Sequence, residues 1–353
     1  MTQLKTQLVK PEVQAAPRRF SGLLAGLEAG PVVSWGLLEV VSLRLAAGVD
    51  AKARERFASP EEHLELVDVP TYGTVVFRNT SKDARLIAPM HVGFFQPGAQ
   101  NHATARALVL DAGETLKTTD CFCVQAAQGG LLKESQQRFL MLPLGLRHQA
   151  LAKRHSEGYS RLWDEIDGYT RHYGAATGGH LERFLRPNFS RLLPLRHALE
   201  TVNGQIGAAY FIAGRLAGVE VAPNEVYWHG LAPVLAMYCY GPAALLAERR
   251  GHGRVSELLD LEDLADLNDL ADRLRDVRAR ETAGRADIVE ELATVFFDQQ
   301  VDEDRHGLRV TTLGYKPWAG QVVRDDRQIM YASVFRDVVA ELGRDGKDVA
   351  EVN

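Results

Sequence analysis

Three hydrogen-bonding side chains in a row, Gln100, Asn101 and His102, are the residues of this sequence most suited to chemistry. They follow a Pro-Gly turn and precede the apolar run 107–110. Amides both donate and accept hydrogen bonds, and an imidazole exchanges protons near neutral pH. If the segment is extended, Gln100 and His102 share one side, where they would line a concave ligand site. The alternative is that Asn101 fixes a turn and His102 caps a strand end, with no ligand involved.

Cys121 and Cys123 are separated by one residue in an apolar run, which places both thiols on one face of a strand. A metal ion would need two more ligands, for which His91 and His102 are the nearest candidates. A lone Cys-x-Cys pair is a weak zinc signal. We therefore interpret the two residues as ordinary buried cysteines and predict neither a metal site nor a particular cofactor.

Acidic residues elsewhere lack a partner motif. We interpret the acidic run 164–167 as a solvated helix face and Asp325-Asp326 as turn residues. Glu220, Glu225 and His229 follow a hairpin and form a weaker candidate cluster. The sequence has no GxSxG motif, no phosphate-binding P-loop and no GxGxxG after a strand. The common hydrolase, nucleotidase and dinucleotide-binding templates are therefore not supported.

The first part of the chain carries short apolar runs between Gly, Pro, Asn and Asp, which is typical of strands joined by turns. After residue 130 the apolar spacing becomes helical in several places. Strands are expected at 32–43 (two, around Gly36), at 74–79, in three runs between Leu86 and Gln125, and at 308–310, 321–323 and 329–334; residues 61–66 fit either a helix or a strand. Helices are expected at 22–27, 147–173, 180–185 (ending at Pro187), 231–246, 288–297 and 332–342.

Two segments carry more specific expectations. Residues 203–221 form the clearest hairpin, and because its strands are apolar on both faces we expect it to be buried in a covered sheet. The segment from Ser256 to Arg280 has leucines at every third residue. We expect a helix contacted on several sides, or two short helices; a partner surface is the alternative.

Composition limits the class of protein. The formal net charge of −5 argues against binding of nucleic acid, whose partners are usually basic. Three cysteines are too few for a disulfide framework and predict a reducing, cytoplasmic setting. No apolar run approaches the ~20 residues that span a bilayer. We predict an α+β protein with a mainly antiparallel β N-terminal part and helices concentrated in the second half. Its expected parts are a flexible tail at 1–19, a single domain at 20–343 (β-rich at 30–130, mixed at 131–343) and a charged tail at 344–353.

From about Ser21 to Phe335 the chain resembles a bacterial domain family of unknown function named for its association with ADP-ribosylglycohydrolase and rhodanese-phosphatase genes. The features that carry the resemblance are Gly98, Gln100-Asn101, Asp111-Ala112-Gly113, Cys123-Val124-Gln125, Gly129, Leu146-Arg147, the hairpin 203–221, Trp228, Tyr238 and the segment 327–335. His102 stands where the family more often has Arg, and Gln125 where it tends to have Glu; the Arg-Trp that usually follows is absent. Any acid-base chemistry carried by that Glu would be lost here.

The resemblance implies a fold and a gene neighbourhood rather than a mechanism. We expect a soluble accessory protein that binds a small nucleotide-like ligand in nucleotide or ADP-ribose metabolism, or in a stress or phage response. The expected ligand-binding residues are Gln100, Asn101, His102 and Gln125. The alternative is a non-catalytic protein that builds a homo-oligomer, and a homo-oligomer is the expected state in either case.

Overall fold

The computed structural model describes residues 15–19, 26–49, 51–96, 99–126, 129–131, 138–199, 201–251, 296–336 and 338. The leucine-rich segment from Ser256 to Arg280 lies outside these residues. So do residues 22–25 of the expected first helix and residues 288–295 of another.

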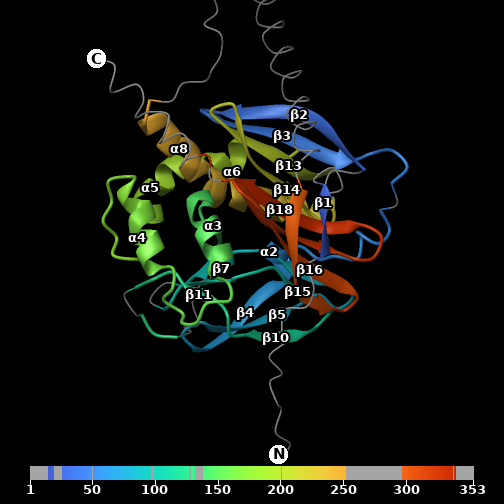
Figure 1. Cartoon of the computed structure of the whole chain (residues 1–353), viewed down its shortest axis with the longest axis horizontal. Helices are drawn as coiled ribbons and strands as arrows, with labels where there is room; N and C mark the ends of the chain where they lie inside the picture. The colour runs from blue at the N-terminus through green and yellow to red at the C-terminus, as the bar shows by residue number, and fades with distance from the viewer. Residues whose placement is uncertain are drawn as a thin grey trace, which may run out of the picture.

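Among the described residues, nine strands form one antiparallel sheet in the order β1-β15-β16-β17-β18-β14-β13-β3-β2 (Figure 1). The sheet therefore joins the two ends of the chain. Its strands are β1 (Ala15–Arg19), β2 (Leu27–Trp35), β3 (Leu38–Leu45), β13 (Gln205–Ile212), β14 (Arg215–Val221), β15 (Phe296–Arg305), β16 (Leu308–Tyr315), β17 (Trp318–Arg324) and β18 (Ile329–Arg336).

The hairpin β13–β14 lies near the middle of this sheet, and each of its strand residues except Arg215 is buried. Its side chains alternate between two apolar clusters, one on each face of the sheet. Tyr210 belongs to the larger cluster and Phe211 to the smaller one. The prediction of a hairpin covered on both faces is therefore confirmed.

The described residues also form three smaller antiparallel sheets, which lie below most of the large sheet in Figure 1. They are built from residues 64–141, and their short strands come together in the orders β10-β5-β4, β11-β8-β7-β12 and β6-β9. The strands are β4 (Leu64–Thr71), β5 (Thr74–Asn79), β6 (Leu86–Ala88), β7 (Val92–Phe95), β8 (His102–Ala103), β9 (Leu108–Leu110), β10 (Thr115–Thr118), β11 (Phe122–Cys123) and β12 (Arg138–Met141).

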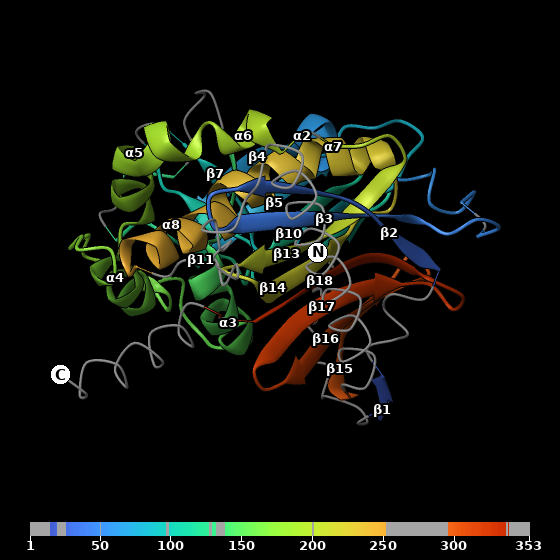
Figure 2. The same cartoon turned by 90° about the horizontal axis from the view of Figure 1, so that it is seen from above.

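The helices pack beside the central hairpin and against the smaller sheets (Figure 2). Within the part of the chain that the structure describes, nearly all of them lie between residues 144 and 249, which confirms the α+β class and the strand-rich N-terminal part. They are α2 (Pro60–His63), α3 (Leu144–Ala152), α4 (Trp163–Arg171), α5 (Leu181–Leu192), α6 (Leu195–Ala198), α7 (Glu225–Val234), the π-helix η1 (Leu235–Tyr240) and α8 (Gly241–Arg249).

The last three form one continuous helix, Glu225–Arg249, which by length and composition alone could span a membrane. Within the described part of the chain no other helix meets that criterion, and 94% of its apolar window is buried inside the protein. The helix begins six residues before the expected position, because the Asn224 side chain accepts a hydrogen bond from the Tyr227 backbone and caps it.

Several boundaries differ from the sequence prediction. The helix expected to stop at Pro187 runs on to Leu192, since Phe184 and Leu192 are buried and Asn188 Nδ2 donates to the Phe184 carbonyl. The helix expected from Ala332 is strand as far as Arg336. There, the side chains of Val334 and Phe335 are buried on opposite faces of the sheet, which is the two-residue period of a strand rather than the 3.6-residue period of a helix.

Pairing at the edge of the large sheet explains two more differences. Phe296 and Phe297, expected at the end of a helix, begin β15 instead. They pair with Arg19 and Arg18 of β1, within the segment expected to be a flexible tail.

The single helix expected at 147–173 is instead two helices, α3 and α4, separated by the turn at 153–162.

Candidate functional site

The loop that carries Gln100, Asn101 and His102 is fully packed: the three residues are 0%, 0% and 4% exposed. Gln100 reaches toward the strand β11. Its Nε2 lies 2.5 Å from Cys123 Sγ and its Oε1 accepts from the Gly129 backbone at 2.9 Å. The Gln100 amide therefore ties the loop to the segment that follows β11.

Asn101 is the centre of a second set of bonds. Its Oδ1 accepts from the Gln96 backbone at 2.7 Å, and its Nδ2 donates to Glu182 Oε2 at 3.2 Å. Its own backbone N–H donates to Gln125 Oε1 at 3.2 Å. The structure thus brings the predicted residues together and adds Glu182 from α5, which no local pattern in the sequence connects to this loop.

The His102 ring is held at both nitrogens. Nε2 accepts from the Gly73 backbone N–H at 3.1 Å, and Nδ1 lies 3.1 Å from the Gln100 carbonyl, to which it donates when neutral. Burial lowers the pKa of His102 to about 4, against a smaller opposing effect of the Gln100 carbonyl. At neutral pH this residue is therefore a neutral imidazole that joins two backbone segments.

Two buried polar atoms beside this cluster have no hydrogen-bond partner among the described residues, Gln96 Oε1 and His180 Nδ1. His180 forms a short antiparallel bridge with Gln125 at the start of α5. The polar side-chain atoms of Gln100, Asn101 and His102, by contrast, all contact other groups of the protein. A ligand-binding role for these three and Gln125 stays a prediction.

The cysteines are buried, as expected. Burial raises the pKa of Cys121 and Cys123, and it raises the pKa of Cys239 to about 12. All three are therefore protonated thiols at neutral pH, a poor state for a nucleophile. The described residues contain no group of three His, Cys, Asp or Glu side chains placed to hold a metal ion.

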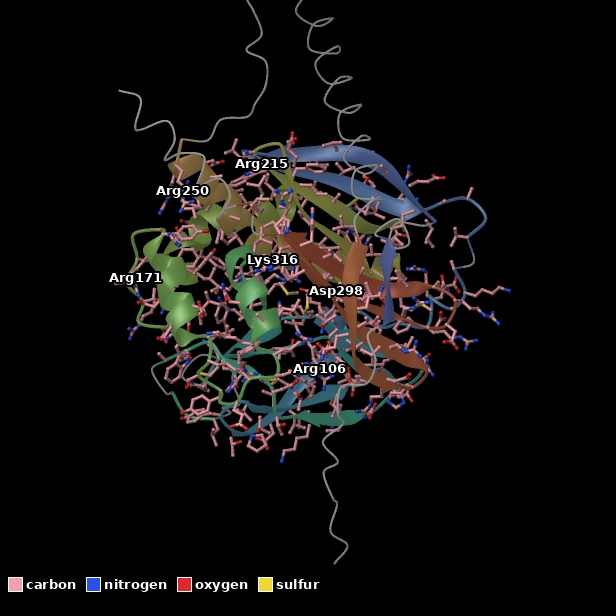
Figure 3. All side chains as sticks on the ribbon, viewed as in Figure 1. Arg106, Arg171, Arg215, Arg250, Asp298 and Lys316 are labelled. Atoms are coloured by element: carbon pink, nitrogen blue, oxygen red, sulfur yellow. The ribbon has the colours of Figure 1, made fainter. Side chains whose placement is uncertain are left out.

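The acidic residues interpreted as structural have structural partners. Asp167 pairs with Arg171, which Figure 3 labels on α4, and Glu165 pairs with Lys153. Asp325 Oδ1 accepts from the backbone N–H groups of Arg327 and Gln328, as a turn residue does.

The expected cluster of Glu220, Glu225 and His229 is divided by the fold. Glu225 and His229 form an exposed pair at 3.9 Å along α7. Glu220 instead points into the interior from β14, where it is 1% exposed. It therefore belongs to a different environment.

That environment is a buried charged centre, and sequence reasoning missed it. Arg147 of α3 is 0% exposed; its Nη1 donates to Glu220 Oε1 at 2.7 Å and its Nη2 to Ser333 Oγ at 2.6 Å. Tyr240 Oη donates to the same carboxylate oxygen at 2.8 Å, and the Arg147 guanidinium covers the Phe335 ring at 4.4 Å. Burial lowers the pKa of Arg147, but Glu220 and weaker neighbours raise it overall, so the guanidinium stays charged.

A cavity of about 870 Å³ lies on the other side of the π-helix η1, and it too was missed. Its volume is within the range of about 300–1,000 Å³ that is usual for small-molecule sites. The walls come from α2, β4, β7, β12, α5, α6, α7 and η1. Because these elements span residues 61 to 238, no local motif could have indicated the cavity.

The π-helix separates the cavity from the charged centre. Met237 and Tyr238 line the cavity, whereas Cys239 and Tyr240 contact the Arg147–Glu220 pair. Single π-turns inside α-helices are frequent at functional sites. Consecutive residues of one turn thus serve both environments.

The cavity combines aromatic rings with charges of both signs. Phe94, Phe139 and Phe189 are among its apolar lining, and Tyr238 is 8% exposed. Burial raises the pKa of the Tyr238 hydroxyl, while two arginines that face it, Arg138 and Arg196, act in the opposite direction. The arrangement offers stacking surfaces beside two guanidinium groups and a phenol.

A family model described as the ARG and Rhodanese-Phosphatase-superfamily-associated Protein domain matches residues 27–335. No curated protein matches the chain. No solved structure matches it either.

Proposed function

The chain belongs to the family of ARG- and rhodanese-phosphatase-associated proteins, and on that premise we propose that it binds a nucleotide-like ligand in the cavity beside η1. The domain is associated with ADP-ribosylglycohydrolase and rhodanese-phosphatase genes, and this association supports an accessory role. The proposal places that role in ADP-ribose or nucleotide metabolism, including a stress or phage response.

The observation that carries the proposal is the grouping of Arg138, Arg196 and Tyr238 at the cavity wall. Guanidinium groups are the side chains best suited to phosphate, because they donate paired hydrogen bonds in a fixed plane. Arg138 is exposed at the start of β12, and within the part of the chain that the structure describes no carboxylate pairs with it. Its guanidinium can therefore receive an anion, and the phenylalanines supply faces for a base.

A thermal-shift screen of the full chain with ADP-ribose, adenosine nucleotides and dinucleotides tests the proposal. A ligand that binds only the native state stabilises it by about 2.7 kcal/mol at a concentration of 100 Kd. We expect at least one of these compounds to raise the melting temperature. Arg138→Ala should remove most of that rise. Arg309→Ala, which removes one member of an exposed pair on β16, is the control and should preserve it.

The alternative, a non-catalytic homo-oligomeric assembly protein, would place its contacts at exposed strand edges. One outer strand of the large sheet is β2, where Pro31 lacks an N–H and the register shifts between Ala29 and Val32. Both features weaken strand addition at that edge. A mass measurement in solution tests this alternative directly: a stable oligomer without any ligand response would favour it.

A further inference from the structure

We propose that the ligand of the cavity carries a positively charged aromatic ring in addition to phosphate, as a pyridinium dinucleotide does. This inference rests on the proposed function and concerns the same cavity. The charged side chains of the lining divide into those that have an oppositely charged neighbour among the described residues and those that have none.

Two of the three cavity carboxylates are paired. Arg196 Nη2 lies 3.5 Å from Glu61 Oε1, and Arg78 Nε lies 2.8 Å from Glu65 Oε2. These pairs are partly exposed and individually weak, but they leave neither carboxylate without a counter-charge.

Glu62 and Arg138 are in a different position. The nearest basic group to Glu62 within the described residues is His63, at 3.9 Å, and 68% of the Glu62 side chain is exposed. Arg138 stands at the start of β12, and Glu62 in α2. Counting only described neighbours, the lining therefore presents one available anion and one available cation, a combination that suits a zwitterionic ligand.

The aromatic part of the lining favours the same ligand. The rings of Phe94 and Phe139 meet edge to face, with centroids 5.6 Å apart. Aromatic faces attract cations by about 0.5–1 kcal/mol at exposed sites, and more where water is excluded.

NAD⁺ and NADH provide a matched pair of probes, because they differ in the charge of the nicotinamide ring. Each would be titrated by calorimetry into the full-length protein, together with ADP-ribose, which lacks that ring. We expect NAD⁺ to bind about fivefold more tightly than NADH, the ratio that corresponds to the upper value of about 1 kcal/mol for an exposed pair of opposite charges, here the Glu62 carboxylate and the pyridinium ring. Glu62→Gln should remove most of this preference, and the exposed control Glu157→Gln should preserve it.

The outcomes separate this inference from the function on which it rests. Equal affinities for NAD⁺ and NADH would overturn the recognition of a cation and leave nucleotide binding intact. A preference that survives Glu62→Gln would also overturn it, because the carboxylate would then have no part in the discrimination. Failure of all three compounds to bind would overturn this inference; the proposed function would fall with it only if the adenosine nucleotides of the thermal-shift screen also failed to bind.

Discussion

Arg147 Nη1 and Glu220 Oε1 meet at 2.7 Å in the interior of the protein, where the two side chains are 0% and 1% exposed. Each comes from a different layer: α3 supplies the arginine and β14 the glutamate. Arg147 Nε and Glu220 Oε2 have no hydrogen-bond partner among the described residues. The pair is therefore incompletely satisfied, and each charge depends strongly on the other.

Removing one charge of this pair should be far more costly than removing a surface charge. We expect Glu220→Gln to lower the free energy of unfolding by about 3–5 kcal/mol, because it leaves the Arg147 guanidinium buried without a counter-ion. Urea denaturation measures the loss. Glu225→Gln, on the exposed face of α7, is the matched control and should cost less than about 1 kcal/mol. Equal effects of the two substitutions would mean that the buried pair contributes no more than a surface one.

Gly218 of β14 makes room for the hydroxyl group that completes this centre. A Cβ at position 218 would lie 2.2 Å from Tyr240 Oη and 3.0 Å from Cζ of the same ring. Gly218→Ala should therefore destabilise the protein by about 1–3 kcal/mol through overpacking.

In a Tyr240→Phe background the hydroxyl is gone, so the same Gly218→Ala substitution should cost less. A double-mutant cycle on the free energy of unfolding measures this coupling. Strictly additive effects would show that the alanine methyl group and the tyrosine hydroxyl do not compete for the same space.

The hairpin β13–β14 and the final strands could be predicted because their apolar residues follow a local period. Strands at 74–79, 308–310, 321–323 and 329–334 fall within β5, β16, β17 and β18 for the same reason. The predicted ends of helices were wrong where contacts with distant segments determine them. At Pro187, a residue type that usually ends a helix, burial of Phe184 and Leu192 extends the helix to Leu192.

The candidate site could be predicted only in part. Gln100, Asn101 and His102 were visible as an unusual run, but their partners come from Gly73, Glu182 and the segment after β11. The cavity and the Arg147–Glu220 pair depend entirely on segments that are far apart in the sequence. The ion pairs of Arg106, which is labelled in Figure 3, could not be predicted for the same reason, because its partners Asp120 and Glu303 come from distant segments.

Asn101 should contribute to stability whether or not the loop binds a ligand. Asn101→Ala leaves the Gln96 N–H and the Glu182 carboxylate without their bonds to its amide, and we expect a loss of about 1–3 kcal/mol. Thermal or urea unfolding measures it. Asn188→Ala removes a single bond to a helix carbonyl and should cost less. An Asn101→Ala protein as stable as the wild type would contradict this structural role.

His102 should make the protein less stable as the pH is lowered. Burial lowers the pKa of His102 to about 4 in the folded protein, compared with about 6.5 in the unfolded chain. Between these values the unfolded state binds a proton that the folded state excludes, so the free energy of unfolding falls as the pH falls from 6.5 to 4. The full effect is roughly 3 kcal/mol, and below about pH 4 it stops growing.

The physical cause is visible at Nε2, which accepts the Gly73 N–H and cannot do so once protonated. His102→Gln removes the titrating group, although it also weakens the fold at neutral pH through the lost bonds. The decisive quantity is therefore the slope: between about pH 7 and pH 5 the wild-type protein should lose about 2 kcal/mol more than His102→Gln. The buried His91, whose pKa is also lowered by burial and by Arg147, titrates in both proteins and cancels in the comparison. Parallel curves would mean that His102 is protonated in the folded state as easily as in the unfolded chain, contrary to its two backbone hydrogen bonds.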